Sequence, residues 1–256
     1  MRAFLALLKK EFLEGLRSRR LVILGLLFVL FGIMNPAIAK LTPWLLDLTS
    51  ESLASSGMTV GEVTVDALTS WTQFFKNIPM ALIIFLLMYS GIFTGEYQSG
   101  SLVLILTKGV SRYKIVLSKT LILLSLWTAG YWLCYGVTYA YTAYYWDQSI
   151  MQGLTPAALN WWLFGVWTVS LSVLFSVLSK GYSSVLLGTG GCVVACYLLG
   201  QLPKLRAYTP TALTDSMTLL LGSEDPDKFL PALLITVGIS LLCVIASIPI
   251  FNKKQL

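Results

Sequence analysis

The chain has 256 residues, of which 56% are hydrophobic and only 12% are charged. An average soluble domain carries about twice that charged share, roughly 25%. This composition disfavours a soluble enzyme and indicates a polytopic membrane protein. The chain has no histidine, which excludes serine–histidine and cysteine–histidine catalysis within it. The four cysteines lie inside apolar stretches, where they are expected to pack as small hydrophobic residues.

The N-terminal segment 1–20 has the pattern of an amphipathic helix. Its apolar residues recur every four positions, at Phe4, Leu8, Phe12 and Leu16. Its charged residues lie on the opposite face, at Lys10, Glu14 and Arg17. Such a helix is expected to lie in the membrane interface. It serves either as a plain anchor for the first membrane span or as a functional element in its own right.

Six uncharged apolar stretches have the length needed to cross a bilayer as a helix, about 17 to 25 residues. They are 21–39, 78–95, 120–146, 157–179, 181–202 and 229–251. The sequence therefore predicts an all-α integral membrane protein with a single six-span domain over 1–256. Because none of these stretches contains Asp, Glu, Lys or Arg, an ion-coupled transporter is disfavoured.

The basic residues indicate which side of the membrane each loop faces. Most of the 18 Lys and Arg residues flank one side of the predicted spans: Arg2, Lys9, Lys10, Arg17, Arg19, Arg20, Lys108, Arg112, Lys114, Lys119, Lys180, Lys253 and Lys254. By the positive-inside rule that side is cytoplasmic. We therefore expect a multi-pass protein of the cytoplasmic membrane with both termini inside and with extracytoplasmic loops at 40–77 and 203–228. A partner in the cytoplasm would have to supply the energy for any transport.

The connection between the second and third spans carries an apolar stretch, although charged residues place it outside the membrane. Its apolar residues are Leu102, Val103, Ile105 and Leu106, within the region 100–112. A short apolar helix at this level needs a cover, either the lipid interface or a groove in another protein. Gly109 is expected to end this helix, and Ser111 to cap a new helix that begins near Arg112.

These residues resemble a known family, the type 2 ATP-binding-cassette (ABC) exporter permeases. The matching residues around the second-to-third connection are Glu96, Tyr97, Gly100, Ser101, Leu102, Leu106, Val110, Ser111, Arg112 and Lys119. The N-terminal Lys10, Glu11 and Phe12, and the FFKNIP stretch at 74–79, are similar to further family features. The sequence departs from the family at two positions, because threonine is common in place of Ser101 and proline in place of Gly109.

The resemblance implies a half-transporter that seats an ABC ATPase at its cytoplasmic face and pairs with a second permease, identical or a sister chain. It assigns ATPase coupling to Glu96, Tyr97, Gly100, Leu102, Leu106, Ser111 and Arg112, and places Lys10, Glu11, Phe12 and Arg17 on an interfacial helix beside them. Glu96 is expected to pair with Arg112 or with a basic residue of the partner. Since the chain has no G-x-x-x-x-G-K-[ST] loop, ATP and Mg²⁺ are expected on the partner and no cofactor on this chain.

The fifth predicted span carries small residues at every fourth position: Ser184, Gly188, Cys192, Cys196 and Gly200. Small residues allow helix backbones to approach closely in lipid. We expect this row to pack within one subunit, with a seam between two permeases as the alternative.

Three functions remain as hypotheses from the sequence. The first is an ABC exporter permease, for which the charge-free, aromatic-rich spans favour a hydrophobic or amphipathic substrate such as a peptide, lipid or drug. The second is a membrane-embedded enzyme, for which no catalytic constellation is found. The third is a non-transporting immunity or sensory subunit associated with an ATPase. The basic residues are accounted for by the membrane, so no nucleic-acid partner is expected.

Overall fold

The computed structural model describes residues 2–55, 65–107, 109–149 and 151–254, and these residues form helices joined by short connections, with no strand among them. In chain order the helices are α1 (Arg2–Arg17), α2 (Arg20–Ser55), α3 (Ala67–Tyr89), α4 (Thr94–Gln98), α5 (Ser101–Thr107), α6 (Arg112–Tyr145), α7 (Leu154–Leu178), α8 (Tyr182–Gly200), α9 (Pro203–Arg206), the 3₁₀ helix η1 (Pro210–Thr214), α10 (Ser216–Leu220), the 3₁₀ helix η2 (Pro226–Phe229) and α11 (Leu230–Lys253).

Six helical segments in this part of the chain are long and apolar enough to cross a membrane, which confirms the predicted all-α class and the six spans. They are Arg20–Trp44, Ala67–Gln98, Arg112–Tyr145, Leu154–Leu178, Tyr182–Gly200 and Pro226–Lys253. Several helices extend beyond the apolar stretches that predicted them. As a result these longer segments contain charged residues, although the predicted stretches contained none: Arg20, Lys40, Lys76, Glu96, Arg112, Lys114, Lys119, Asp227, Lys228 and Lys253.

The expected outer loop at 40–77 is partly helical. Instead of ending at Ala39, α2 continues to Ser55, and Pro36 and Pro43 are accommodated inside it. The next described helix, α3, begins well before the predicted start at Ile78 because Asp66 caps its N-terminus. The Asp66 side chain accepts a hydrogen bond from the backbone N–H of Thr69 at 2.9 Å, which satisfies one of the free donors of the first turn.

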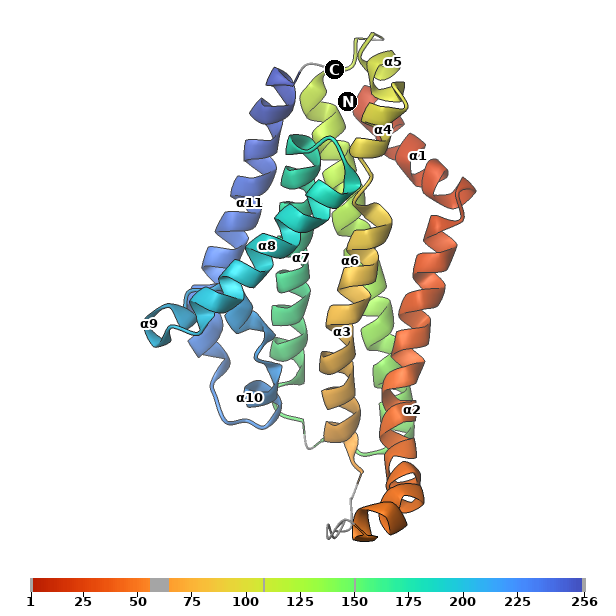
Figure 1. Ribbon diagram of the computed structural model, residues 1–256, viewed down its shortest axis with the longest axis vertical. Coiled ribbons are helices and arrows are strands. Elements are labelled where there is room, and N and C mark those ends of the chain that lie inside the picture. Colours follow the sequence, from red (N-terminus) through yellow and green to blue (C-terminus); the bar gives the residue numbers. More distant parts are fainter. Residues whose placement is uncertain (1, 56–64, 108, 150, 255–256) are drawn as a thin grey trace.

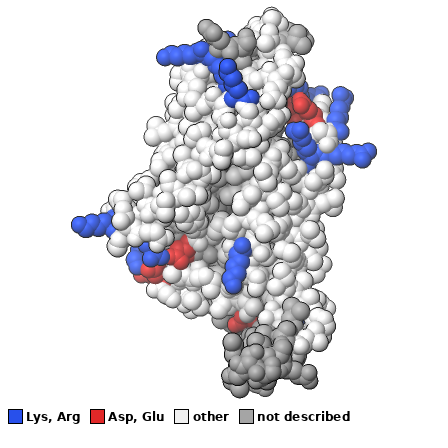
Figure 2. Space-filling model, viewed as in Figure 1, with Lys and Arg blue, Asp and Glu red and all other residues white. Residues whose placement is uncertain are grey.

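The long helices form an elongated bundle, and both ends of the described chain lie at the same end of it (Figure 1). This end, which also holds α1, α4 and α5, is hereafter named the termini end. Within the bundle α7 is the most buried of the long helices and packs against α11, α6 and α8. On the visible face, charged side chains lie near the termini end and over the lower half of the molecule, and most of the remaining surface is uncharged (Figure 2). A mostly uncharged surface suits a bundle that spans a bilayer.

A buried polar network joins α2, α3 and α6 where Pro36 interrupts the hydrogen bonds of α2. Pro36 has no N–H, so the carbonyl of Gly32, four residues earlier, loses its usual donor. The Thr138 hydroxyl donates to this carbonyl at 3.1 Å and accepts a hydrogen bond from Asn35 Nδ2 at 3.1 Å. Asn77 Nδ2 donates in turn to Asn35 Oδ1 at 2.9 Å. Neighbouring helices thus satisfy the backbone group that the proline leaves free, as a membrane interior demands.

Replacing Thr138 by Val is expected to lower the free energy of unfolding by about 0.6–1.7 kcal/mol, the range measured for hydrogen bonds between membrane helices. Thr120→Val is the matched control, because the hydroxyl of Thr120 is also buried but, among the described residues, bonds only to the Val116 carbonyl of its own helix. Thermal unfolding of the purified variants in detergent measures the effect of each substitution on stability. Equal effects of the two substitutions would show that the network adds nothing to helix–helix stability.

Candidate coupling site at the termini end

The segment between α3 and α6 folds into two short helices separated by a glycine. After α4 ends at Gln98, Gly100 adopts a φ of +68°, which reverses the chain before α5 begins. A residue with a Cβ atom would be strained by about 1–2 kcal/mol in this left-handed conformation, which explains why a glycine stands here. Gly109 has a φ of +76° and separates α5 from α6 in the same way. The predicted helix over Ser101–Thr107 is therefore present as α5.

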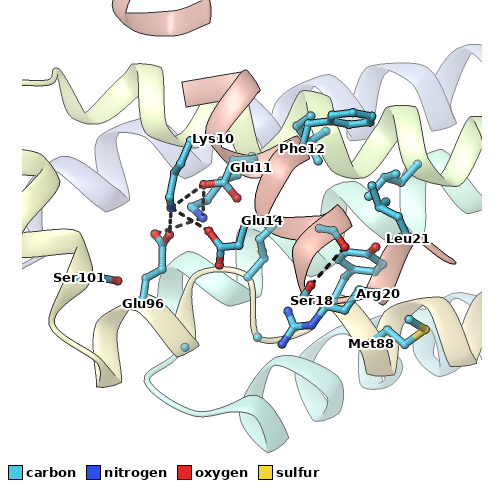
Figure 3. Close-up of a pocket in the computed structure, with 18 of the residues that line it drawn as sticks. Lys10, Glu11, Phe12, Glu14, Ser18, Arg20, Leu21, Met88, Glu96 and Ser101 are labelled. Atoms are coloured by element: carbon cyan, nitrogen blue, oxygen red, sulfur yellow. Dashed lines mark hydrogen bonds and ion pairs between the residues drawn. The ribbon is translucent and has the colours of Figure 1, made fainter. Parts of the chain in front are cut away.

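A compact cluster of ion pairs joins α4 to α1 and α6. The ammonium group of Lys119 lies 3.0 Å from Glu11 Oε1 and 3.1 Å from Glu96 Oε2. The ammonium group of Lys10 lies 2.6 Å from Glu96 Oε1, 3.2 Å from Glu11 Oε1 and 3.3 Å from Glu14 Oε2. These five residues, Lys10, Glu11, Glu14, Glu96 and Lys119, are hereafter named the ion cluster; four of them are labelled in Figure 3, where three carboxylates surround one ammonium group.

Burial makes the charged groups of the ion cluster depend on one another. Lys119 is only 1% exposed, so its ammonium group depends on Glu11 and Glu96 in place of water. Burial by itself lowers the pKa of Lys10, but the hydrogen bond to Glu96 and the charge of Glu11 outweigh it, and the pKa is raised above its ordinary value. Lys10 therefore stays charged at physiological pH. The cluster fixes where α1 sits relative to α4 and α6.

The cluster differs from the expectation for Glu96. Glu96 pairs with Lys10 and Lys119 of its own chain, so the predicted pair between Glu96 and Arg112 is wrong. The reason is geometric, because Arg112 at the first turn of α6 faces the C-terminus of α11, whereas Lys119 lies further along α6 and faces α1. The two carboxylates of Glu11 and Glu14 complete a triad with Glu96 whose oxygens lie within 4.8 Å of one another. Two ammonium groups share these oxygens, so the described side chains form an ion-pair network.

Arg112 caps the C-terminal end of α11. Its Nη1 donates to the carbonyls of Phe251, Asn252 and Lys254 at 2.9, 2.9 and 2.8 Å. The last carbonyls of a helix have no partner within the helix and carry its negative dipole end, so a guanidinium is a favourable ligand for them. The contact ties the start of α6 to the end of α11.

Lys254 continues this connection to α7 and α4. Its ammonium group donates to the carbonyls of Val177 and Ser179 at 2.5 and 2.8 Å, where α7 ends. It also lies 4.0 Å from the centre of the Tyr97 ring, a cation–π contact. Burial, together with the nearby charge of Lys180, lowers the pKa of Lys254. Arg112, Lys254 and Tyr97 are hereafter named the C-terminal clasp.

Glu96 and Tyr97, although adjacent in sequence, connect α4 to opposite sides of the bundle. Neighbouring residues on a helix point in different directions. Glu96 joins α1 and α6 through the ion cluster, whereas the ring of Tyr97 contacts Lys254 and lies 6.3 Å from the ring of Phe251 at the end of α11. The short helix α4 therefore links α5 to four longer helices.

The expectation for Leu102 needs a correction. Its side chain is 1% exposed and packs in the hydrophobic core of its own chain, so it is not free to enter a partner's groove. Leu106 is half-buried and packs against the same core. Among the side chains of α5 that the structure describes, Val103, 43% exposed, is an apolar one that points outward. The sequence could not separate these positions, because a run of consecutive apolar residues shows no helical period.

The other expected residues are placed as follows. Ser111 is exposed at the N-cap position of α6, without a side-chain capping bond. Phe12 and Arg17 are exposed on α1. Their expected interfacial role stays a prediction.

The row of small residues on α8 faces α7 and the segment that follows α8. A Cβ atom at Gly188 would collide with the ring of Phe175 on α7, and one at Gly200 would come within 3.0 Å of Thr211 Oγ1. Cys192 and Cys196 are half-buried against the core, whereas Ser184 at the start of the helix is exposed. These contacts agree with packing inside one subunit, and a seam between two permeases stays open for the outward face of α8.

The chain is similar to known proteins over most of its length. Residues 5–256, nearly the whole chain, match the family described as ABC-2 family transporter protein. The chain is also similar to the Uncharacterized transmembrane protein YxlG of Bacillus subtilis (strain 168), with 27% identity over 201 residues that cover 77% of this chain and 72% of that protein. With its six candidate membrane spans and a family match over almost its full length, the chain belongs to the ABC-2 family and is a membrane component of an ABC transporter.

Proposed function

We propose that the chain is the permease subunit of an ABC exporter, which moves a hydrophobic or amphipathic substrate such as a peptide, lipid or drug across the cytoplasmic membrane. A separate ABC ATPase seated on α5 supplies the energy and carries the ATP and Mg²⁺. The observation that carries this proposal is the arrangement of α4 and α5: a short helix presents Val103 outward and is joined through α4 to both sides of the bundle.

The contacts of α4 can transmit a movement of α5 to the longer helices of the bundle. A displacement of α5 by the ATPase is transmitted through Glu96 to α1 and α6, and through Tyr97 and Lys254 to α11 and α7. The ion cluster and the C-terminal clasp attach α4 to these helices by several short contacts each, so a displacement of α5 that moves α4 also moves them. A second permease, identical or a sister chain, completes the path for substrate in this proposal.

The orientation of the bundle belongs to the same proposal. Both termini and α5 lie at one end, and the positive-inside rule assigns that end to the cytoplasm. In a variant without the four native cysteines, a cysteine at the exposed Ser223 is expected to react with a membrane-impermeant maleimide in intact cells, and a cysteine at the exposed Ser111 only after the cells are lysed. Labelling of position 111 in intact cells would reverse the assigned orientation.

The seating of the ATPase is tested by Val103→Asp. A carboxylate at the contact would be desolvated, so the substitution is expected to abolish co-purification of a chain that has a phosphate loop and ATPase activity. Leu205→Asp is the matched control, because Leu205 is 41% exposed but belongs to α9, away from the termini end. If Val103 merely lies among lipid headgroups, the ATPase is recovered with both variants and the coupling assignment fails. If the complex forms normally but never transports or responds to substrate, the immunity or sensory alternative holds.

A further inference from the structure

A cavity of about 550 Å³ opens at the termini end beside the ion cluster. It lies among α1, the start of α2, the end of α3 and α4, and Tyr182 of α8 contributes to its wall. The expected coupling role uses Glu96 on one side of this cavity but leaves the space itself without a function. It lies between α1 and the ends of the first two candidate membrane spans, which is the level at which headgroups meet hydrocarbon when such spans cross a bilayer.

The charged groups on the cavity wall are divided into a negative and a positive region. The ion cluster contains three carboxylates and two ammonium groups, so it carries an excess of one negative charge. Within the described part of the chain Glu14 has one ion-pair partner, Lys10, and it is 59% exposed by its side chain. Farther along the same wall, Arg20 has no carboxylate within ion-pair distance among the described residues. Figure 3 shows Glu14 and Arg20 separated along this cavity, with Ser18 between them.

Part of the remaining wall is apolar, and it also includes a buried polar group without a partner among the described residues. Leu21, Leu87 and Met88 line the cavity, and Leu87 is exposed to the surroundings of the bundle. The hydroxyl of Tyr89, a residue of the same wall, is buried and has no hydrogen-bond partner among the residues that the structure describes. A buried hydroxyl without a partner is costly, and a bound acceptor would relieve that cost.

We infer that this cavity binds the headgroup of a zwitterionic aminophospholipid, such as phosphatidylethanolamine. The ammonium group of the lipid is placed at Glu14, its phosphate at Arg20 and within reach of Tyr89, and its acyl chains along Leu21 and Leu87. An ammonium group complements the negative excess of the ion cluster, whereas a purely anionic lipid complements Arg20 alone. A soluble phosphoethanolamine would leave the apolar wall uncovered, so the lipid is the favoured source of this chemistry. The inference rests on the membrane location and not on export.

Lipid retention by the purified full-length protein provides the test. Protein stripped with detergent is mixed with phosphatidylethanolamine, phosphatidylglycerol or glycerophosphoethanolamine, and binding is followed by native mass spectrometry and by the shift in melting temperature. Phosphatidylethanolamine is expected to bind at least about tenfold more tightly than the other two, as the loss of one charged contact or of the buried acyl chains implies. Equal retention of phosphatidylglycerol, or tighter binding of the soluble headgroup, would overturn the inference.

Variants locate the site. Glu14→Gln and Arg20→Gln are each expected to weaken phosphatidylethanolamine binding about tenfold, because each removes one charged partner. Lys9→Gln and Arg17→Gln are the matched controls, since both residues are charged and exposed on α1 but do not line the cavity. The melting temperature of each lipid-free variant shows whether the fold itself is intact. Unchanged binding in the Glu14 and Arg20 variants, or the same loss in the controls, would place the lipid elsewhere.

Discussion

Replacing Lys119 by Met is expected to lower the free energy of unfolding by about 3–5 kcal/mol, the cost of removing one partner from a buried ion pair. Lys119 is 1% exposed, and its ammonium group faces both Glu11 and Glu96. Without it, the three carboxylates share Lys10 alone, and the ion cluster carries two excess negative charges in place of one. Chemical unfolding of the purified protein in detergent micelles measures the loss.

The charge balance of the cluster provides the control for this result. Combining Lys119→Met with Glu11→Gln returns the excess to one negative charge and is expected to recover much of the lost stability. Lys114→Met removes a lysine from the same helix that has no ion pair among the described residues, and is expected to cost less than about 0.5 kcal/mol. A Lys119 variant as stable as the Lys114 variant would show that the ion cluster does not hold α1 in place.

The Arg112→Gln variant is expected to retain ATP hydrolysis by the bound ATPase but to lose transport. The substitution removes the contacts of Nη1 with three carbonyls at the end of α11. Because Nη1 carries two hydrogens, at least one of them is shared between carbonyls, and a fully formed hydrogen bond to a charged group contributes about 1.5–3 kcal/mol. Amide hydrogen exchange of residues 251–254 is expected to become faster, because the end of α11 is released. The ATPase is expected to remain bound, since Val103 is untouched.

Arg112→Lys distinguishes charge from geometry at this position. A lysine keeps the positive charge but lacks the planar guanidinium that reaches several carbonyls together, so only partial recovery of transport is expected. Transport in proteoliposomes and ATPase activity are measured for both variants. Normal transport by Arg112→Gln, with the faster exchange at the end of α11, would show that the C-terminal clasp stabilises the chain without coupling it.

The sequence was sufficient for the architecture because membrane spans are long and uniformly apolar. The extent of the helices was harder to predict, since Pro36 and Pro43 both lie inside α2, and at Pro36 another helix supplies the missing hydrogen bond. Of the ion cluster, the Lys10–Glu14 pair could be predicted from its i,i+4 spacing. The pairs from Lys10 to Glu96 and from Lys119 to Glu11 span 86 and 108 positions, and no local pattern indicates which charges meet across such distances.

The orientation of α5 was likewise hard to predict, because it depends on contacts between residues far apart in the sequence. Gly100 could be recognised from the resemblance, and its positive φ supplies the physical reason for a glycine at this position. Which side of α5 faces outward depends on how α4 packs against α1 and α11, so Leu102 and Val103 could be distinguished only in the folded chain. The role of Arg112 as a cap for α11 likewise depends on the C-terminus returning to the start of α6.

Whether an ABC ATPase sits on α5 is tested most directly by site-specific photo-crosslinking. A photoreactive phenylalanine analogue is placed at Val103 in one variant and at Leu234 in another; Leu234 is exposed on α11 within a candidate membrane span. After illumination in cells, we expect position 103 to crosslink to a chain that carries a phosphate loop, and position 234 not to. Crosslinks from position 103 to lipid alone, with the ATPase attached through another surface, would contradict this expectation.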